Sequence, residues 1–319
     1  MPIINTRRLT VGALGTAMAV LAMAPAAQAA PHGGLGELGE RRDTSVTVGR
    51  LVLEPTERGY RGSVPLTISY RGTETADLSL TVTEPVAGAF AAVDSDFPCF
   101  YGQRDGELRR DINCGANPIR AGERREYTLD FEVLTTTRAY AMSAVGGAVT
   151  VQTADSRPVT VTDSFDTLFR STTGSLRNPR PYVQDTQTDA TVTAGAATLV
   201  RQDDGSYLGR VPVTVRYDGD APHDGLQLEA VLPDGVQLRG ISPEAVCLFP
   251  WCEVPGGDFM PGEERSMELL VSAPAGTAPG DLGTGTVRLH TVFFLDELSD
   301  VDPSDNAAAF SITAVDGAA

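Results

Sequence analysis

The sequence contains no lysine, and its 25 basic residues, all arginines, are outnumbered by 42 acidic residues. The formal net charge is −17. A surface with this excess of negative charge repels polyphosphate chains and anionic lipid headgroups. The composition therefore argues against nucleic acid and membrane surfaces as partners.

Apart from one N-terminal run, the sequence also lacks any apolar stretch long enough to cross a membrane. That run, residues 11–24, follows Arg7 and Arg8 and precedes the small residues 27–29. A basic start, an apolar centre and a small-residue end are typical of an export signal. We therefore expect a signal peptide over residues 1–29 and a secreted, extracellular product without a membrane anchor. The paired arginines leave both the general and the twin-arginine export route open.

Histidine is scarce as well, with His32, His223 and His290 as its only occurrences. The sequence contains no Gly-x-Ser-x-Gly elbow, no His-Glu-x-x-His pair and no phosphate-binding glycine loop. These absences favour a protein that is not an enzyme. Paired carboxylates for sugar hydrolysis are recognised by their separation in space, so the 42 acidic residues leave a secreted enzyme as the alternative.

What the chain does contain is an internal repeat. The segment Tyr60–Tyr70 aligns without a gap with Tyr207–Tyr217. One residue of shift later, two leucines, a proline and a cysteine also match, namely Leu78, Leu80, Pro85 and Cys99 with Leu226, Leu228, Pro233 and Cys247. A repeat of this length, built from short alternating segments, indicates a duplicated β domain.

Within each copy, apolar and polar residues alternate over short segments, which is the period of a half-buried strand. No window shows the helical period, so the predicted fold class is all-β, with two tandem immunoglobulin-like β-sandwich domains. Pro65 favours an edge position or a bulge for its strand, because proline has no backbone N–H. The predicted strands lie at residues 45–53, 60–70, 77–83, within 119–133, 148–153 and 159–162 in the first copy, and at 207–217, within 260–271, 287–292 and 307–313 in the second.

Composition sets the expected domain boundaries. Residues 30–43 are rich in glycine and poor in apolar side chains, and we interpret them as a flexible leader. Residues 44–164 and 189–316 form two β-sandwich domains, each large enough for a hydrophobic core. Between them, residues 165–188 carry prolines and small polar residues, which predict a partly extended linker with little to bury.

Four cysteines in an exported chain indicate two disulfides. Cys99 and Cys114 lie in the first copy, and Cys247 and Cys252 lie at the corresponding stage of the second, so the repeat favours pairing within each copy. Closing such loops stabilises a domain by roughly 2–3 kcal/mol in the chain-entropy model. A zinc site of four thiolates is the alternative, although such sites are more typical of reducing compartments.

The second copy resembles a known family. The resemblance rests on residues 217–222, the segment 226–236, the cysteine pair, the turn 261–264 and the ending 300–308. These features are similar to bacterial secreted repeats of the CARDB type and of the conserved-repeat type known as domain of unknown function eleven. The similarity covers most of the second copy and, more loosely, the first. It implies an immunoglobulin-like sandwich used in extracellular adhesion, spacing or assembly, without catalytic residues.

The cysteine loops are rich in aromatic residues. Phe100 and Tyr101 follow the first cysteine, and Phe249 and the only tryptophan, Trp251, lie inside the second loop. An aromatic ring held by a small disulfide loop is a preorganised anchor. We predict that these four residues bind an extracellular protein or carbohydrate, or an enzyme that the chain inhibits. Alternatively, the rings pack over the disulfides within the sandwich.

Asp300, Asp302 and Asp305 belong to the densest acidic stretch of the chain. Calcium binds at turns that are rich in oxygen ligands, so these carboxylates are candidate calcium ligands. The stretch lacks the EF-hand order of aspartates, and a solvated acidic hairpin is the alternative. No other cofactor is predicted.

Overall fold

The computed structural model describes residues 43–94, 98–104, 106–155 and 158–317. The expected signal peptide, residues 1–29, and all but the last residue of the expected leader lie outside these ranges. Within them, the chain forms strands joined by turns and bends, without a helix. The described part of the chain therefore contains no helix that could span a membrane. The predicted all-β class is confirmed.

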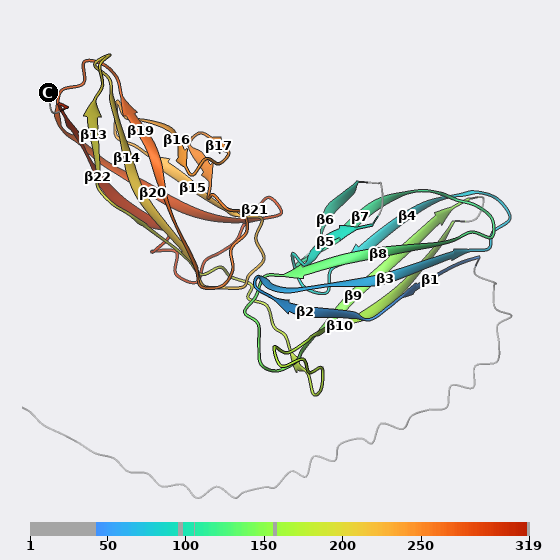
Figure 1. Ribbon diagram of the computed structural model, residues 1–319. Coiled ribbons are helices and arrows are strands. Elements are labelled where there is room, and N and C mark those ends of the chain that lie inside the picture. The colour runs from blue at the N-terminus through green and yellow to red at the C-terminus, as the bar shows by residue number, and fades with distance from the viewer. Residues whose placement is uncertain (1–42, 95–97, 105, 156–157, 318–319) are drawn as a thin grey trace, which may run out of the picture. The chain divides into compact units, whose positions relative to one another are not determined.

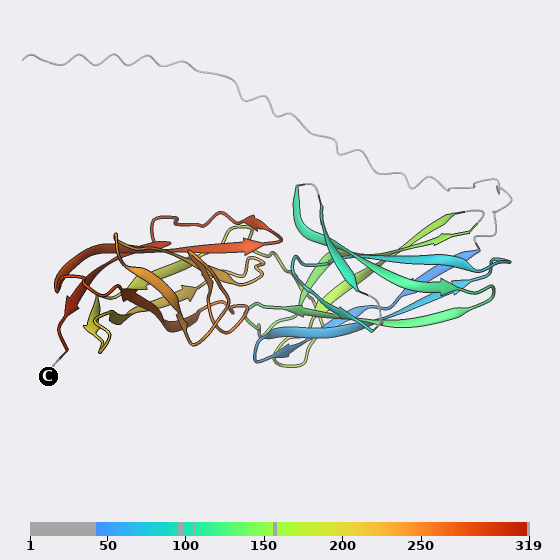
Figure 2. The same cartoon turned by 90° about the horizontal axis from the view of Figure 1, so that it is seen from above.

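The first sandwich has eleven strands in two layers (Figures 1 and 2). One layer has the order β5-β8-β3, with β1 beside β3, and the other has the order β10-β9-β4-β7-β6, with β11 beside β9. Strand β2 joins the layers, because it pairs in parallel with β10 and forms a hairpin with β3. The bounds are β1 (Thr44–Val48), β2 (Leu51–Thr56), β3 (Gly59–Tyr70), β4 (Ala76–Thr83), β5 (Phe90–Val93), β6 (Cys99–Arg104), β7 (Glu107–Ile119), β8 (Arg124–Val133), β9 (Met142–Ala154), β10 (Val159–Phe169) and β11 (Arg180–Pro181).

The second sandwich repeats this topology strand by strand. Strands β12 to β20 take the places of β1 to β9 in the same order, and β22 takes the place of β10. The shared order confirms that the chain is a tandem duplication of one β-sandwich. The bounds are β12 (Ala190–Ala194), β13 (Ala197–Arg201), β14 (Tyr207–Tyr217), β15 (Leu226–Val231), β16 (Gln237–Ser242), β17 (Cys247–Leu248), β18 (Trp251–Glu253), β19 (Glu263–Ala273), β20 (Gly280–Phe293), β21 (Asp296–Glu297) and β22 (Ala307–Val315).

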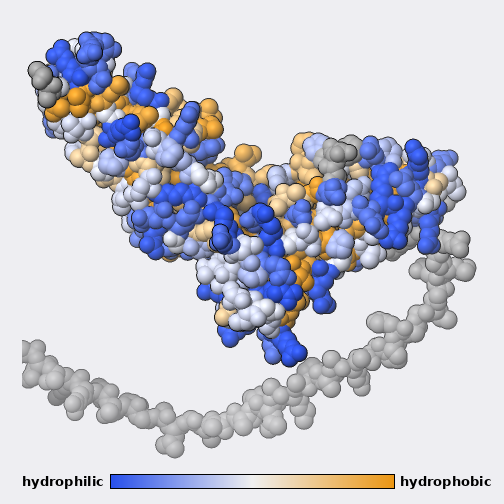
Figure 3. All heavy atoms as spheres, in the orientation of Figure 1, coloured by the Kyte–Doolittle hydropathy of each residue, from blue (hydrophilic) through white to orange (hydrophobic). Residues whose placement is uncertain are grey.

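The core of each sandwich consists of the alternating apolar residues that face the space between the layers. The repeated strands β3 and β14 show the same pattern of burial, with a tyrosine at each end and three aliphatic residues between them. Leu78, Leu80 and Val82 of β4 are buried as predicted. On the face drawn in Figure 3, hydrophilic residues cover much of the surface between smaller hydrophobic areas.

The segment predicted as one strand, residues 45–53, forms two strands instead. β1 and β2 are separated at Gly49 and Arg50, and only β2 reaches the other layer. The inward positions change phase across the break, from Val46 and Val48 to Leu51 and Leu53, which a single continuous strand would not do. A strand that changes layers in this way connects the two sheets of the sandwich.

The predicted edge position or bulge at Pro65 is wrong. β3 is an interior strand between β8 and the pair β1 and β2, and its register with β8 is regular. Pro65 lies opposite the break, where its carbonyl accepts the N–H of Gly49 at 3.0 Å. In the second copy, Pro212 accepts the N–H of Gly195 at 2.9 Å. Proline has no backbone N–H to donate. Because the neighbouring strand is interrupted opposite each proline, the missing N–H leaves no strand hydrogen bond unmade.

The expected linker begins inside the first sandwich. β10 continues to Phe169, five residues beyond the predicted boundary at 164, because Phe165 and Phe169 are buried in the core. Further along, Tyr182 packs against Phe169 with ring centroids 4.9 Å apart, and the short strand β11 pairs with β9. This segment therefore buries more than its composition predicts.

Each sandwich contains one disulfide between neighbouring strands. Cys99 of β6 bonds to Cys114 of β7, and Cys247 of β17 bonds to Cys252 of β18. The bonded residues face each other directly in the strand register. Pairing within each copy is thus confirmed, and the zinc alternative is excluded because all four sulfurs are used.

Candidate functional site

The outer face of the second sandwich carries charged and aromatic side chains next to the disulfide. Successive residues of a strand point to opposite faces, so Cys252 is buried in the core while Trp251 and Glu253 point outward. Strand register then aligns outward residues across the sheet. One row consists of Arg288, Glu229, Trp251 and Leu248, and the next consists of His290, Gln227 and Glu253.

These rows border a pocket of about 300 Å³. Trp251 lines it together with the apolar side chains of Val246, Leu248 and Val292. Its polar lining comes from Gln227, Glu253, His290 and Glu297. A volume of this size is at the lower end of the range for small-ligand sites, and apolar walls with a few polar groups are typical of them.

His290 holds the tryptophan side of the pocket in place. Its Nδ1 atom lies 2.7 Å from Oε1 of Glu297, and its Nε2 atom lies 3.7 Å from Oε2 of Glu229. The imidazole ring meets the Trp251 ring edge to face, with centroids 4.5 Å apart. The Trp251 ring thus lies between a disulfide-linked hairpin and a histidine fixed by carboxylates, which preorganises it for contact.

Glu297 reaches the pocket because the chain folds back after β20. β21 pairs with the end of that strand, with Val292 opposite Glu297. This hairpin has no counterpart in the strand order of the first sandwich. The carboxylate next to His290 is therefore a feature of the second copy.

The other aromatic residues predicted to bind do not join Trp251. Phe249 is 58% exposed and lines a separate shallow groove of about 510 Å³ with Pro250, Val236 and Leu238. Phe100 and Tyr101 belong to the first sandwich. Phe100 is 67% exposed, whereas the Tyr101 ring lies beneath the Arg110 guanidinium, 4.2 Å from its carbon to the ring centroid. Among the predicted aromatic residues, Trp251 alone lines the pocket described above.

The candidate calcium ligands are engaged by the chain itself. Buried Asp300 accepts hydrogen bonds from the Thr188 hydroxyl and the Ala190 N–H through Oδ2, and from the Asp302 N–H through Oδ1. Asp302 accepts from the hydroxyl and N–H of Ser304. Within the described ranges, no group of three or more acidic, histidine or cysteine side chains could hold a metal ion.

Asp305, the third candidate, lies close to the same carboxylates. Burial raises the pKa of Asp305, and the negative charges of Asp302 and Asp300 raise it further. A bound cation would have the opposite effect on this pKa. The candidate calcium site is therefore put to an experimental test in the Discussion.

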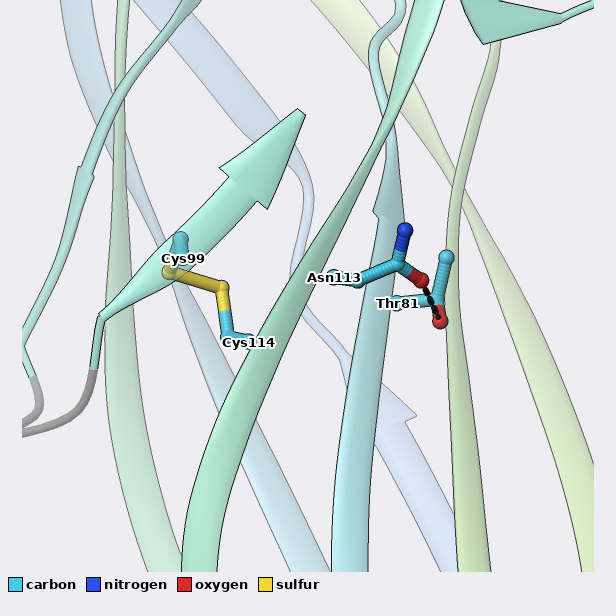
Figure 4. Close-up of a disulfide and its surroundings, with 4 residues drawn as sticks. All are labelled: Thr81, Cys99, Asn113 and Cys114. Carbon is cyan, nitrogen blue, oxygen red and sulfur yellow. Dashed lines mark hydrogen bonds between the residues drawn. A yellow bond between two sulfur atoms is a disulfide. The ribbon is translucent and has the colours of Figure 1, made fainter. Parts of the chain in front are cut away.

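The corresponding position of the first sandwich is built differently. There, Asn113 precedes Cys114 as Trp251 precedes Cys252, and Thr81 takes the place of Glu229. The Thr81 hydroxyl donates a hydrogen bond to the Asn113 side-chain oxygen at 2.9 Å, and both lie near the disulfide (Figure 4). Small polar side chains that bond to one another thus replace the aromatic and charged row. The two copies share a frame and differ at this site.

Several residues in or next to the pocket were not predicted as site residues from the sequence, namely Gln227, Glu229, Val246, Leu248, Glu253, His290, Val292 and Glu297. They come from five strands and the loop before β17, and only strand register brings them together. Alternation does show that Trp251 and Glu253 share a face, because they are two residues apart. The return of Glu297 to His290 leaves no such signal.

Comparisons with known proteins do not place the chain in a family. No protein-family model matches the chain, and no curated protein matches it. The resemblance to the CARDB and conserved-repeat domains accordingly remains a prediction.

Solved structures with similarity to the chain are distant. The CupB6 tip adhesin of Pseudomonas aeruginosa is 11% identical, with a TM-score of 0.28, over 86% of this chain and 98% of that one. A protein of unknown function from Porphyromonas gingivalis W83 is 13% identical, with a TM-score of 0.23, over 85% and 99%. A non-cellulosomal cohesin from Archaeoglobus fulgidus is 14% identical, with a TM-score of 0.27, over 40% and 89%. Likeness at this level carries no argument about function.

Proposed function

We propose that this protein is a secreted, non-catalytic binding module that engages an extracellular partner through the Trp251 pocket of its second sandwich. The disulfides and the lack of a membrane-spanning helix in the described residues fit an extracellular protein. The export signal predicted for residues 1–29 supports the same location. The first sandwich serves as a spacer or structural unit, in line with the adhesive and spacing roles implied by the family resemblance.

One observation carries the proposal: the only tryptophan of the chain lines a preformed pocket on the outer face of the second sandwich, where its ring packs against His290. A half-buried tryptophan held between a histidine and a disulfide-linked hairpin offers a partner a large and rigid contact surface, and tryptophan is enriched among the residues that dominate binding energy. The first copy has the same fold with asparagine in that place. Trp251 is therefore better explained by contact with a partner than by stability.

A histidine next to a glutamate is also a feature of many active sites, but catalysis has less support here than binding. His290 and Glu297 form the base and orienting carboxylate of a nucleophile-activating group. The residues that line the pocket supply no serine or threonine hydroxyl, and their one cysteine is in a disulfide. The remaining catalytic option is hydrolysis by two carboxylates, and in this pocket only Glu253 and Glu297 could serve as that pair. We keep a non-catalytic role as the proposal.

The test is capture of a partner by the full chain from the native extracellular medium. We expect a protein or glycan to be retained by the unmodified chain and lost with Trp251→Ala. Truncation of a tryptophan at the centre of a binding site typically weakens affinity by about 2 kcal/mol or more, which is about 30-fold. Phe100→Ala is the matched control, because Phe100 is an exposed ring at the corresponding hairpin of the first sandwich.

Retention of every captured molecule by Trp251→Ala would contradict the proposal. Circular dichroism of both variants establishes that the fold is intact before the comparison is made. Release of a chemically altered molecule from the captured material would instead support the enzyme alternative.

A further inference from the structure

We propose that the Trp251 pocket receives a basic side chain, a lysine or an arginine, presented by a partner polypeptide. This inference rests on the proposed function and specifies its ligand chemistry. It follows from the charge of the pocket, the character of its walls and the surface around its mouth.

The pocket carries negative charge. Glu253 and Glu297 line it, and Glu229 lies directly behind His290. No arginine is among the lining residues, although the chain contains 25 basic residues. His290 is the basic side chain of the wall, and it already contacts Glu297. An incoming cation would therefore meet the Glu253 carboxylate directly and share Glu297 with the imidazole, and carboxylates are the strongest acceptors for ammonium and guanidinium donors.

The walls suit the stem of a long basic side chain. Val246, Leu248 and Val292 are apolar, and Trp251 offers the aromatic surface that attracts cations most strongly. Lysine and arginine pack their methylene groups against apolar surface while the charged end stays near polar groups. A pocket with apolar sides, a tryptophan and carboxylates accommodates both halves of such a side chain.

Other ligand classes fit less well. An anion would face the pocket carboxylates and the net charge of −17. A neutral sugar could stack on Trp251 and donate hydroxyl hydrogen bonds to Glu253 and Glu297, but it would bring no positive charge to balance the two carboxylates. A basic group is the ligand that turns both carboxylates into favourable contacts.

The surroundings of the pocket point to a polypeptide as the source of the cation. Large apolar side chains are exposed at its mouth and on the adjoining hairpin: Leu248 is 78% exposed, Val246 and Phe249 are 58% exposed, and Leu295, next to β21, is 91% exposed. A free amine would leave these residues in water. A partner chain would cover them as it inserts the basic side chain, and a charged centre within an apolar surround is a common arrangement at binding hot spots.

The test uses the fluorescence of the full chain, because its only tryptophan lies at the site. Three capped tripeptides are titrated: acetyl-Gly-Lys-Gly-amide, acetyl-Gly-Arg-Gly-amide and acetyl-Gly-Gln-Gly-amide. We expect a saturable change with the lysine or the arginine peptide and none with the glutamine peptide. The response should weaken as the NaCl concentration rises, because the attraction is electrostatic.

Glu253→Gln should weaken the binding of the basic peptide about tenfold, which is the typical effect of losing one hydrogen bond to a charged group. The variant keeps Trp251 as the fluorescent reporter. The matched control is Glu268→Gln on β19, where the carboxylate pairs with Arg210 away from the pocket. The salt dependence of the unmodified chain provides a second measurement if Glu253→Gln does not fold.

The inference is overturned if neither basic peptide changes the fluorescence, if the glutamine peptide acts equally well, or if a neutral oligosaccharide such as chitotriose alone gives the saturable response. Failure here is distinct from failure of the proposed function. A partner that is captured through Trp251 but is not displaced by an excess of the basic peptides would support the proposed function. The same result would contradict a basic side chain as the ligand of the pocket.

Discussion

At the scale of single residues, Glu84 is the most constrained polar group of the first sandwich. Its side chain has no exposed surface, and its oxygens accept hydrogen bonds from the backbone N–H groups of Gly88, Phe90 and Arg110. The Arg110 guanidinium, which is 7% exposed, adds an ion pair at 3.0 Å. Every oxygen is thus satisfied inside the fold. Such a pair is costly to break, because the charge that remains is buried without its partner and without water to solvate it.

Glu84→Gln is expected to lower the free energy of unfolding of the first sandwich by about 3–5 kcal/mol. The amide keeps the shape of the carboxylate but loses the charge and directs donors at Arg110. Urea unfolding followed by circular dichroism measures the loss. The control is Glu54→Gln, since Glu54 forms a solvent-exposed pair with Arg170 and should contribute about 1 kcal/mol or less. Equal losses of unfolding free energy in the two variants would contradict the stabilising role of the buried Glu84–Arg110 pair.

At the scale of strands, the crossing of β2 from one layer to the other requires glycine in β3. A Cβ atom on Gly62 would lie 2.2 Å from the carbonyl oxygen of Val52, and one on Gly209 would lie 2.7 Å from that of Thr198. Both obstacles are backbone atoms, which cannot rotate aside. The two copies keep glycine for the same reason, the close approach of neighbouring chains.

Gly62→Ala and Gly209→Ala should therefore each destabilise their own sandwich by about 1–3 kcal/mol, the usual cost of forced overpacking. Thermal unfolding of the full chain provides the measurement. Arg61→Ala, at the neighbouring outward position, serves as the control and should change stability by only a few tenths of a kcal/mol beyond the loss of its exposed ion pair with Glu132. Melting temperatures of the glycine variants equal to that of the control would show that β2 can move away.

Much of the fold could be predicted from the sequence, because alternation reports which side of a strand is buried. Val64, Leu66 and Ile68 face the core as their spacing requires. The break at Gly49 leaves a signal in the sequence, because the apolar positions change phase from Val46 and Val48 to Leu51 and Leu53, but this signal does not show that the second strand joins the other layer. The end of β10 was missed because the inward position between Phe165 and Phe169 is Thr167, a polar residue, and the segment leads into a stretch with the composition of a linker.

The candidate site was predicted only at Trp251, which the sequence marks by its rarity and its position in a cysteine loop. Its neighbours could not be predicted for a physical reason. Glu229 and His290 meet through pairing between strands that are distant in the chain, and Glu297 reaches His290 through the hairpin of β20 and β21. Register is a property of the folded sheet. The copies also differ here, so the repeat that predicts the core is uninformative about the pocket.

At the scale of the whole molecule, the excess of acidic residues sets how the chain responds to ions. A net charge of −17 repels itself in the compact state, so added salt should raise the melting temperature by screening this repulsion. Calcium would raise it in the same way without binding to any particular site. A test of the predicted calcium ligands must therefore separate screening from coordination.

We expect the melting temperature of the full chain in about 10 mM calcium chloride to equal that in sodium chloride of matched ionic strength. The reason is local: Asp300 and Asp302 already accept hydrogen bonds from the chain itself, and calcium would have to replace these donors. A site of the affinity usual in extracellular modules would be occupied at 10 to 100 times its Kd and would stabilise the fold by roughly 1.4–2.7 kcal/mol. A calcium-specific rise of that size, abolished by Asp302→Asn, would establish a calcium site at the acidic hairpin. Equal melting curves in the two salts would instead support a structural role, in which these carboxylates hold the start of the second sandwich.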